Sequence, residues 1–148
     1  MTKNRHSFLR RHSLSITASA ILALWIALYQ ISNPNAHVGA FYGNAVADWT
    51  GLVVMIIATK FLYERGSMES RKVQPLSKSS IREFVHEHSL TIFLVITGIG
   101  WLIWYAAVDP QGKWGQVIGN IVSEWTQILG LVLMTKRLIE RGSKESRR

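Results

Sequence analysis

The chain is 148 residues long, and its 17 lysines and arginines against 9 aspartates and glutamates give a net charge of +8. This length suits a single domain. The sequence contains no cysteine, which excludes disulfides, thiolate metal ligands and thiol catalysis. A basic excess fits either nucleic acid or an anionic membrane surface, and the two differ in where the basic residues lie. Here they flank apolar segments, which favours the membrane and argues against nucleic acid.

Four apolar segments predict four transmembrane helices and hence an all-α membrane protein. They cover residues 14–32, 45–65, 90–108 and 121–141. At about 1.5 Å per residue, each spans roughly 30 Å, the thickness of a bilayer's hydrocarbon core. The first and third segments end at turn-forming residues around Pro34 and Pro110. The second and fourth are expected to end at Gly66 and Gly142, because glycine is common just past a helix C-terminus.

The two halves of the chain repeat each other when one is shifted by 76 residues. GNAVADWT at 43–50 aligns with GNIVSEWT at 119–126, and the two copies of ERGSxESR begin at Glu64 and Glu140. Roughly two residues in five match without a gap from residue 8 onward, which indicates a duplicated helix hairpin. The predicted units are a first repeat at 1–72, a cytoplasmic linker at 73–82 and a second repeat at 83–148.

Lysine and arginine determine the predicted orientation, because they stay on the cytoplasmic side during insertion. Sixteen of the 17 lie near the chain termini, at the ends of the second and fourth segments or between the second and third segments, and only Lys113 lies at the opposite helix ends. We therefore expect both termini in the cytoplasm and the two hairpins inserted in the same orientation, about an axis along the membrane normal. An aromatic belt is expected near the outer face, from Trp25, Tyr29, Phe41, Tyr42, Trp49, Trp101, Tyr105, Trp114 and Trp125.

The first segment also fits a signal peptide, because basic residues precede it and Ala-Val-Ala stands at 45–47. The repeat argues against cleavage, since the equivalent segment at 90–108 lies in mid-chain, where no signal peptide operates. We expect the first segment to remain a membrane helix. Its small residues at every fourth position predict the face that packs on a neighbour: Ser15, Ser19, Ala23 and Ala27.

Two acids inside the segments are the strongest candidates for a functional site. Asp48 and Glu124 are equivalent in the repeat, and each lies four residues after an asparagine, Asn44 or Asn120, on the same helix face. Gln127 extends that face by one turn. Intramembrane acids commonly mark ion paths, proton relays or polar contacts between helices, and two that face each other repel and hold a proton or a cation. The alternative, which the predicted segments favour, places both acids one turn inside the outer interface, where the helix dipole favours a carboxylate.

Other polar residues gather at the cytoplasmic ends of the segments. His12 and His88 are repeat equivalents, so a haem held by both is an alternative, although histidine before serine at a helix start more commonly lies beside an N-cap. No other metal and no cofactor is expected. The basic side chains expected to contact anionic lipid headgroups are Arg10, Arg11, Lys60 and Lys136.

The repeated polar motifs resemble a family of small bacterial multi-pass membrane proteins. The matching positions are Ser13, Leu14, Asp48, Trp49, Arg65, Gly66, Ser67, Glu69 and Ser70, with Ser89, Leu90, Glu124, Trp125, Arg141, Gly142, Ser143, Glu145 and Ser146. This chain departs from the family pattern in its shorter outer loops and in Arg71 and Arg147, where the family has lysine. The family has no assigned activity, so the resemblance implies the architecture and a bacterial inner membrane but no reaction.

The sequence favours a non-enzymatic inner-membrane protein with a structural or partner-binding role, the partner being another membrane protein or a second copy. No Gly-rich phosphate loop, His-Glu metal helix or nucleophile elbow occurs, so an enzyme is not expected. The alternative is a small channel, or a proton- or cation-coupled carrier, that uses Asp48 and Glu124. Four helices with short loops enclose little room for an ion path unless the protein oligomerises, and for this reason the structural role ranks first.

Overall fold

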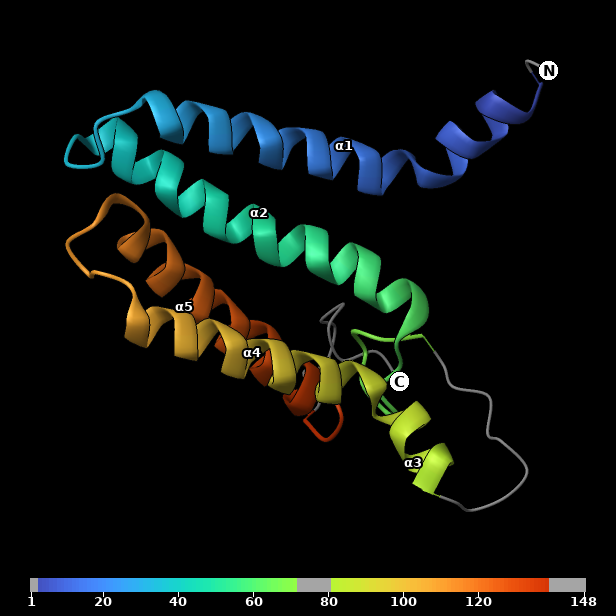
Figure 1. Cartoon of the computed structure of the whole chain (residues 1–148). Coiled ribbons are helices and arrows are strands. Elements are labelled where there is room, and N and C mark those ends of the chain that lie inside the picture. Colours follow the sequence, from blue (N-terminus) through green and yellow to red (C-terminus); the bar gives the residue numbers. More distant parts are fainter. Residues whose placement is uncertain (1–2, 72–80, 139–148) are drawn as a thin grey trace.

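The computed structural model describes residues 3–71 and 81–138, and all regular structure within these ranges is helical. The helices are α1 (Lys3–Ile31), α2 (His37–Phe61), α3 (Ile81–Glu87), α4 (Ser89–Ala107) and α5 (Lys113–Met134) (Figure 1). Four are long and apolar enough to cross a membrane, namely α2, α4, α5 and the part of α1 from Phe8. The prediction of an all-α membrane protein with four spanning helices is confirmed. Most of the predicted linker at 73–82 lies outside the described residues.

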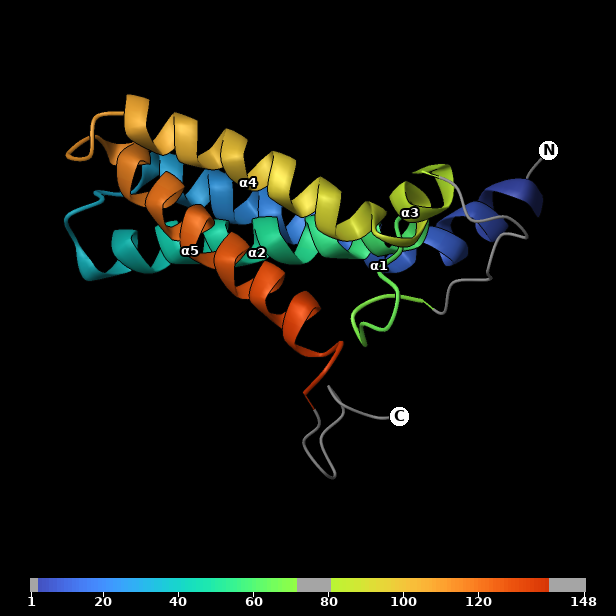
Figure 2. The same ribbon diagram turned by 90° about the horizontal axis from the view of Figure 1, so that it is seen from below.

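α2 and α5 form the central pair of the bundle, with α1 packed on α2 and α4 packed on α5 (Figures 1 and 2). We call the end where α2 and α5 finish the basic end, and the opposite end, with the turns at 32–36 and 108–112, the turn end. The core between the helices consists of Tyr29, Val46, Ala47, Ala58, Leu90, Leu94, Val117, Ile121, Trp125 and Val132.

The same local contacts shape the turn in both hairpins. The side-chain oxygens of Asn33 and Asp109 each accept a 3.0 Å hydrogen bond from the backbone N–H two residues on. A Cβ on Gly39 would lie 1.9 Å from the carbonyl oxygen of Asn33, and one on Gly115 would lie 2.2 Å from that of Asp109. Only glycine allows this close approach. The second helix of each hairpin therefore begins directly after its turn.

The starts of α2 and α5 differ from the sequence prediction. These helices begin at His37 and Lys113, whereas starts at 45 and 121 were expected, so each begins eight residues earlier. Polar residues and glycines are interspersed in their first two turns and lower the apolar content there. A helix, however, needs satisfied backbone hydrogen bonds and not apolar side chains. Hydrophobicity alone therefore places the helix start too late.

The end of α2 also comes earlier than predicted, at Phe61 and not near Gly66. Tyr63 leaves the helix to bind the start of α4, where its N–H donates to Ser89 Oγ at 2.9 Å and its carbonyl accepts from the N–H of Leu90 at 2.9 Å. Gly66 has a φ of +84°, a conformation that favours glycine. It lies in the loop after α2 and, contrary to the prediction, does not end the helix. The end of α5 at Met134 likewise precedes the predicted 141, and Gly142 lies outside the described residues.

α1 packs on α2 through a different face from the predicted one. The predicted small residues Ser19, Ala23 and Ala27 are exposed, and Ser15 is half-buried. The residues that pack toward α2 are Ala18, Leu22, Trp25 and Tyr29. The reason is the apolar area that aromatic rings bury: the ring of Tyr29 lies over Gly43, 3.1 Å from where a Cβ would be. The aromatic belt is wrong for Trp49 and Trp125, which lie near mid-helix.

Candidate functional site

Asp48 and Glu124 lie at the middle of α2 and α5. Each is 11 residues past the first residue of its helix (48 − 37 and 124 − 113). At about 1.5 Å per residue this is roughly 16 Å along the helix axis. The prediction that both acids lie about one turn into their helices is therefore wrong: they lie about three turns in, because the helices start two turns earlier than their apolar content suggested.

The polar residues of α2 and α5 meet across the central helix pair. Asn120 Nδ2 donates a 2.5 Å hydrogen bond to Asn44 Oδ1. The carboxyl groups of Glu124 and Asp48 lie close enough for their charges to interact. The Glu124 side chain also covers Gly51 of α2, with Oε2 3.6 Å from where a Cβ would be. Both polar contacts join residues that are 76 apart, so four of the five candidate residues form one line between the helices.

A cavity of about 540 Å³ opens at the turn end, beside the two asparagines. Its lining includes Asn44, Asn120, Tyr105 and Gln116. The acids lie one helical turn deeper than the asparagines. The cavity thus leads from the turn end toward the carboxyl pair and has polar groups where it approaches that pair.

One side of the carboxyl pair is uncovered in the single chain. Asn44 and Asp48 are exposed, Glu124 is half-buried and Gln127 is exposed on α5. A carboxylate facing hydrocarbon near the bilayer centre costs several kcal/mol, or roughly 3 on insertion scales. This face must therefore meet water or another polar surface when the helices lie in a membrane.

A second polar cluster, not predicted from the sequence, surrounds Glu64 at the basic end. The Glu64 side chain is fully buried, and its Oε1 accepts from Lys136 Nζ at 2.5 Å and from His88 Nδ1 at 2.7 Å. Its Oε2 accepts from the N–H of Thr91 at 3.4 Å. One carboxylate therefore joins the segment after α2, the start of α4 and the segment after α5.

The loop after Glu64 docks at the same place. Ser67 Oγ lies 3.1 Å from Thr135 Oγ1, and the N–H of Met68 donates to Thr135 Oγ1 at 3.3 Å. Arg65 pairs with Glu87 at 3.0 Å. The first copy of the ERGSxES motif, from Glu64 to Ser70, thus joins the first hairpin to the second at the basic end.

Burial and the hydrogen-bond donors act in opposite directions on the pKa of the Glu64 carboxyl group. Burial alone would raise its pKa, but the hydrogen bonds from Lys136, Thr91 and His88 and the charge of Lys136 outweigh burial and lower the pKa below its ordinary 4.5. Glu64 is therefore ionised at neutral pH and acts as a fixed negative charge among its donors.

The two histidines, which the sequence grouped as a pair, have different partners in the structure, and so do the basic residues predicted to contact headgroups. His12 Nδ1 accepts from Lys60 Nζ at 2.7 Å, since an ammonium can only donate, whereas His88 binds Glu64. Lys136 is held by Glu64 and so departs from the predicted headgroup contact. Arg10 and Arg11 are exposed on α1. In the sequence, the feature that could have indicated the Glu64 cluster is that an acid, a lysine and a histidine recur at equivalent positions of the two repeats.

Lys113, the one lysine or arginine at the turn end among the described residues, connects the two hairpins. Its Nζ donates to the carbonyls of Gln30 and Ser32 at 2.8 Å each, where α1 ends. A cation at this position satisfies carbonyls that the helix leaves unpaired. The Tyr29 hydroxyl in turn donates to the Lys113 carbonyl oxygen, and Trp114 packs edge-on against the Tyr29 ring at 5.2 Å.

A scan of protein-family models, a search of curated proteins and a search of solved structures each gave no match to this chain. What the fold and the polar clusters define is a multi-pass helical membrane protein. The resemblance to small bacterial membrane proteins stays a prediction, and the residues of its second motif from Arg141 onward lie outside the described part of the chain.

Proposed function

We propose that this chain is a small inner-membrane protein that conducts or carries protons or monovalent cations, with the Asp48 and Glu124 carboxyl groups as the ion-binding pair. The observation that carries the proposal is that these acids meet at mid-helix, across the α2 and α5 contact. Two neighbouring carboxyl groups away from bulk water share a proton or bind a cation more readily than they both remain as free anions. Because of this placement, we favour ion conduction or transport over the structural role that the sequence alone favoured.

The surrounding groups suit such a role. The cavity at the turn end gives water a route to Asn44 and Asn120, whose amide groups can pass an ion or a water-borne proton on to the acids one turn deeper. Beyond the acids, exposed Gln127 continues the polar line on α5. With both termini in the cytoplasm, as the basic residues predict, the cavity faces outward.

A second copy of the chain would complete the path. Exposed Asp48 leaves the polar line open on one side, and a polar line from a second copy would cover it without placing a carboxylate against lipid. Such a pairing also supplies the room that four short-looped helices lack.

Flux measured in proteoliposomes tests the proposal. A proton-sensitive dye inside the vesicles, with K⁺ or Na⁺ gradients as separate arms, should report flux for the wild type and none for Asp48→Asn combined with Glu124→Gln. Ser123→Ala, an exposed change next to Glu124 that keeps both acids, is the matched control and should retain flux. If the wild type passes none of these ions, or the double variant passes them equally well, the ion-path proposal is wrong.

A structural or partner-binding role is the second candidate. The observation in its favour is that the small residues predicted to pack α1 are largely exposed, so α1 offers a smooth face to another helix. In that case Asp48 and Glu124 would make polar contacts with the partner. Vesicles without flux, together with loss of a co-purifying complex in the double variant, would support this role over the first.

A further inference from the structure

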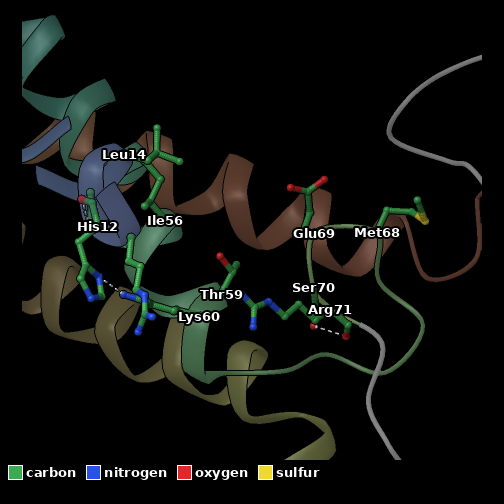
Figure 3. Close-up of a pocket in the computed structure, with 11 residues that line it drawn as sticks. His12, Leu14, Ile56, Thr59, Lys60, Met68, Glu69, Ser70 and Arg71 are labelled. Carbon is green, nitrogen blue, oxygen red and sulfur yellow. Dashed lines mark hydrogen bonds between the residues drawn. The ribbon is translucent and has the colours of Figure 1, made fainter. Parts of the chain in front are cut away.

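A basic cavity lies at the basic end of the bundle, between the start of α1, the end of α2 and the loop after it (Figure 3). Its volume is about 430 Å³. Three cationic side chains from these three segments line it, Arg11, Lys60 and Arg71. In Figure 3 the Arg71 side chain extends from its loop toward Thr59 and Lys60.

The cations of this cavity lack acidic partners in the described part of the chain. The ion pairs formed there are those of Arg65, His88 and Lys136, and none involves Arg11, Lys60 or Arg71. One carboxylate, Glu69, also lines the cavity, so positive charge exceeds negative. The two hairpins differ in this respect, because Lys136, the repeat equivalent of Lys60, is bound by Glu64 at 2.5 Å. Lys60 instead donates to His12 Nδ1 and lies over the Phe61 ring, without an acidic partner among the described residues.

The hydroxyl groups in the cavity wall already donate to backbone carbonyls and so are not donors for a bound group. Ser15 donates to the His12 carbonyl, Thr59 to the Met55 carbonyl and Ser70 to the Arg71 carbonyl. Donors available to an incoming group therefore come from the ammonium and the guanidinium groups, which bind phosphate oxygens well.

Most of the remaining wall is apolar and continues onto an exposed apolar surface of the helices. Leu14 and Ile56 line the cavity on the side of the helices, and Met68 lines it on the side of the loop. Leu14 is 67% exposed, and Phe61, the last residue of α2, is also 67% exposed. Charged groups thus stand at the helix ends, directly beside apolar side chains that face hydrocarbon.

We propose that this cavity binds the phosphate headgroup of an anionic phospholipid, with Arg11, Lys60 and Arg71 around the phosphate and the lipid chains along Leu14. A phosphate beside an apolar surface is the chemistry of a phospholipid, and basic pockets between helices at the cytoplasmic membrane face take such headgroups. The site is independent of the carboxyl pair of α2 and α5.

Native mass spectrometry of the purified full chain, titrated with phosphatidylglycerol or with phosphatidylcholine, tests this site. We expect the anionic lipid to bind more tightly to the wild type, and Lys60→Gln with Arg71→Gln to weaken it about tenfold or more, given that each cation near the surface contributes appreciably. Lys60→Arg with Arg71→Lys, which keeps both charges, should bind nearly as the wild type does. Arg82→Gln with Arg137→Gln removes the same charge from exposed positions outside the cavity and should have a small effect.

Three outcomes would overturn the proposal. Equal affinity for the two lipids would show that the headgroup charge is not recognised. Equal weakening by the control pair would show a diffuse charge effect without a site. Displacement of the lipid by inorganic phosphate at millimolar concentration would show a site for the free anion and not for a lipid.

Discussion

At the scale of single residues, Glu64 is the side chain on which most segments of the basic end depend. Its buried carboxylate accepts from Lys136 after α5 and from His88 and the N–H of Thr91 at the start of α4, so it joins both to the segment after α2. Glu64→Gln leaves the Lys136 ammonium without its counter-charge. We expect a loss of about 3 kcal/mol of unfolding free energy, the lower part of the range for breaking a buried pair, because Lys136 keeps some exposure. Thermal unfolding in detergent measures it.

Glu83→Gln is the control for this change, because Glu83 is a half-buried acid of α3 with no ion pair among the described residues. It should leave the melting temperature nearly unchanged. If the two variants melt at the same temperature, Glu64 does not hold the basic end together.

The same carboxylate predicts how stability depends on pH. The pKa of Glu64 is lower in the folded protein than its ordinary 4.5, so its contribution is fully present above about 4.5 and is lost as the pH falls through the folded pKa. The difference in melting temperature between wild type and Glu64→Gln should be constant near neutral pH and shrink below about pH 4.5. A difference that stays constant down to pH 3 would contradict the assignment.

The sequence pointed to a residue correctly where its side-chain type is rare in its segment. It failed where the role of the residue depends on a spatial neighbour from another part of the chain. Asp48 and Glu124 stood out because acids are costly in apolar segments, and the structure brings them together. Glu64 looked like an ordinary charged residue after a helix, since nothing in the order of residues shows that Lys136 and His88 come to it from another hairpin. Pairing across hairpins is tertiary information.

At the scale of helices, the existence of the four spanning helices was predictable and their ends were not. Apolar content defines a span well, but α2 and α5 begin at His37 and Lys113 because the turns before them fix their first backbone hydrogen bonds. This error mattered for the site: it changed the position of both acids from one turn deep to mid-helix. The packing face of α1 was also missed, because aromatic rings outweighed small residues.

The glycines that follow each turn allow a direct test of this account. Gly39→Ala would place a Cβ 1.9 Å from a backbone oxygen, so either the turn or the helix start must move. We expect a loss of more than about 2 kcal/mol, as for severe overpacking. Gly115→Ala should behave alike, since its Cβ would lie 2.2 Å from a backbone oxygen. Chemical or thermal unfolding in detergent provides the measurement.

Gly100→Ala in α4 is the matched control, because a Cβ there meets nothing within 4 Å. Alanine favours a helix over glycine by about 1 kcal/mol, so this change should be neutral or slightly stabilising. Equal destabilisation by all three substitutions would show that glycine itself, and not the close approach at the turns, is what the helices need.

At the scale of the whole molecule, the polar line along α2 and α5 makes the single chain incomplete in a membrane. Leu52 lies one turn beyond Asp48 on the same face of α2 and is 46% exposed. It is not one of the polar side chains of the line, so replacing it leaves the acids and the asparagines in place. The natural chain has no cysteine, so Leu52→Cys introduces the only thiol. If a second copy covers the polar line, a short bis-maleimide should link two Leu52→Cys chains into a dimer in native membranes. Ile103→Cys, on α4 and 65% exposed, should stay monomeric under the same treatment. Linking at both positions would indicate random collision, and linking at neither would leave the exposed carboxylate without the second copy that the proposed ion path requires.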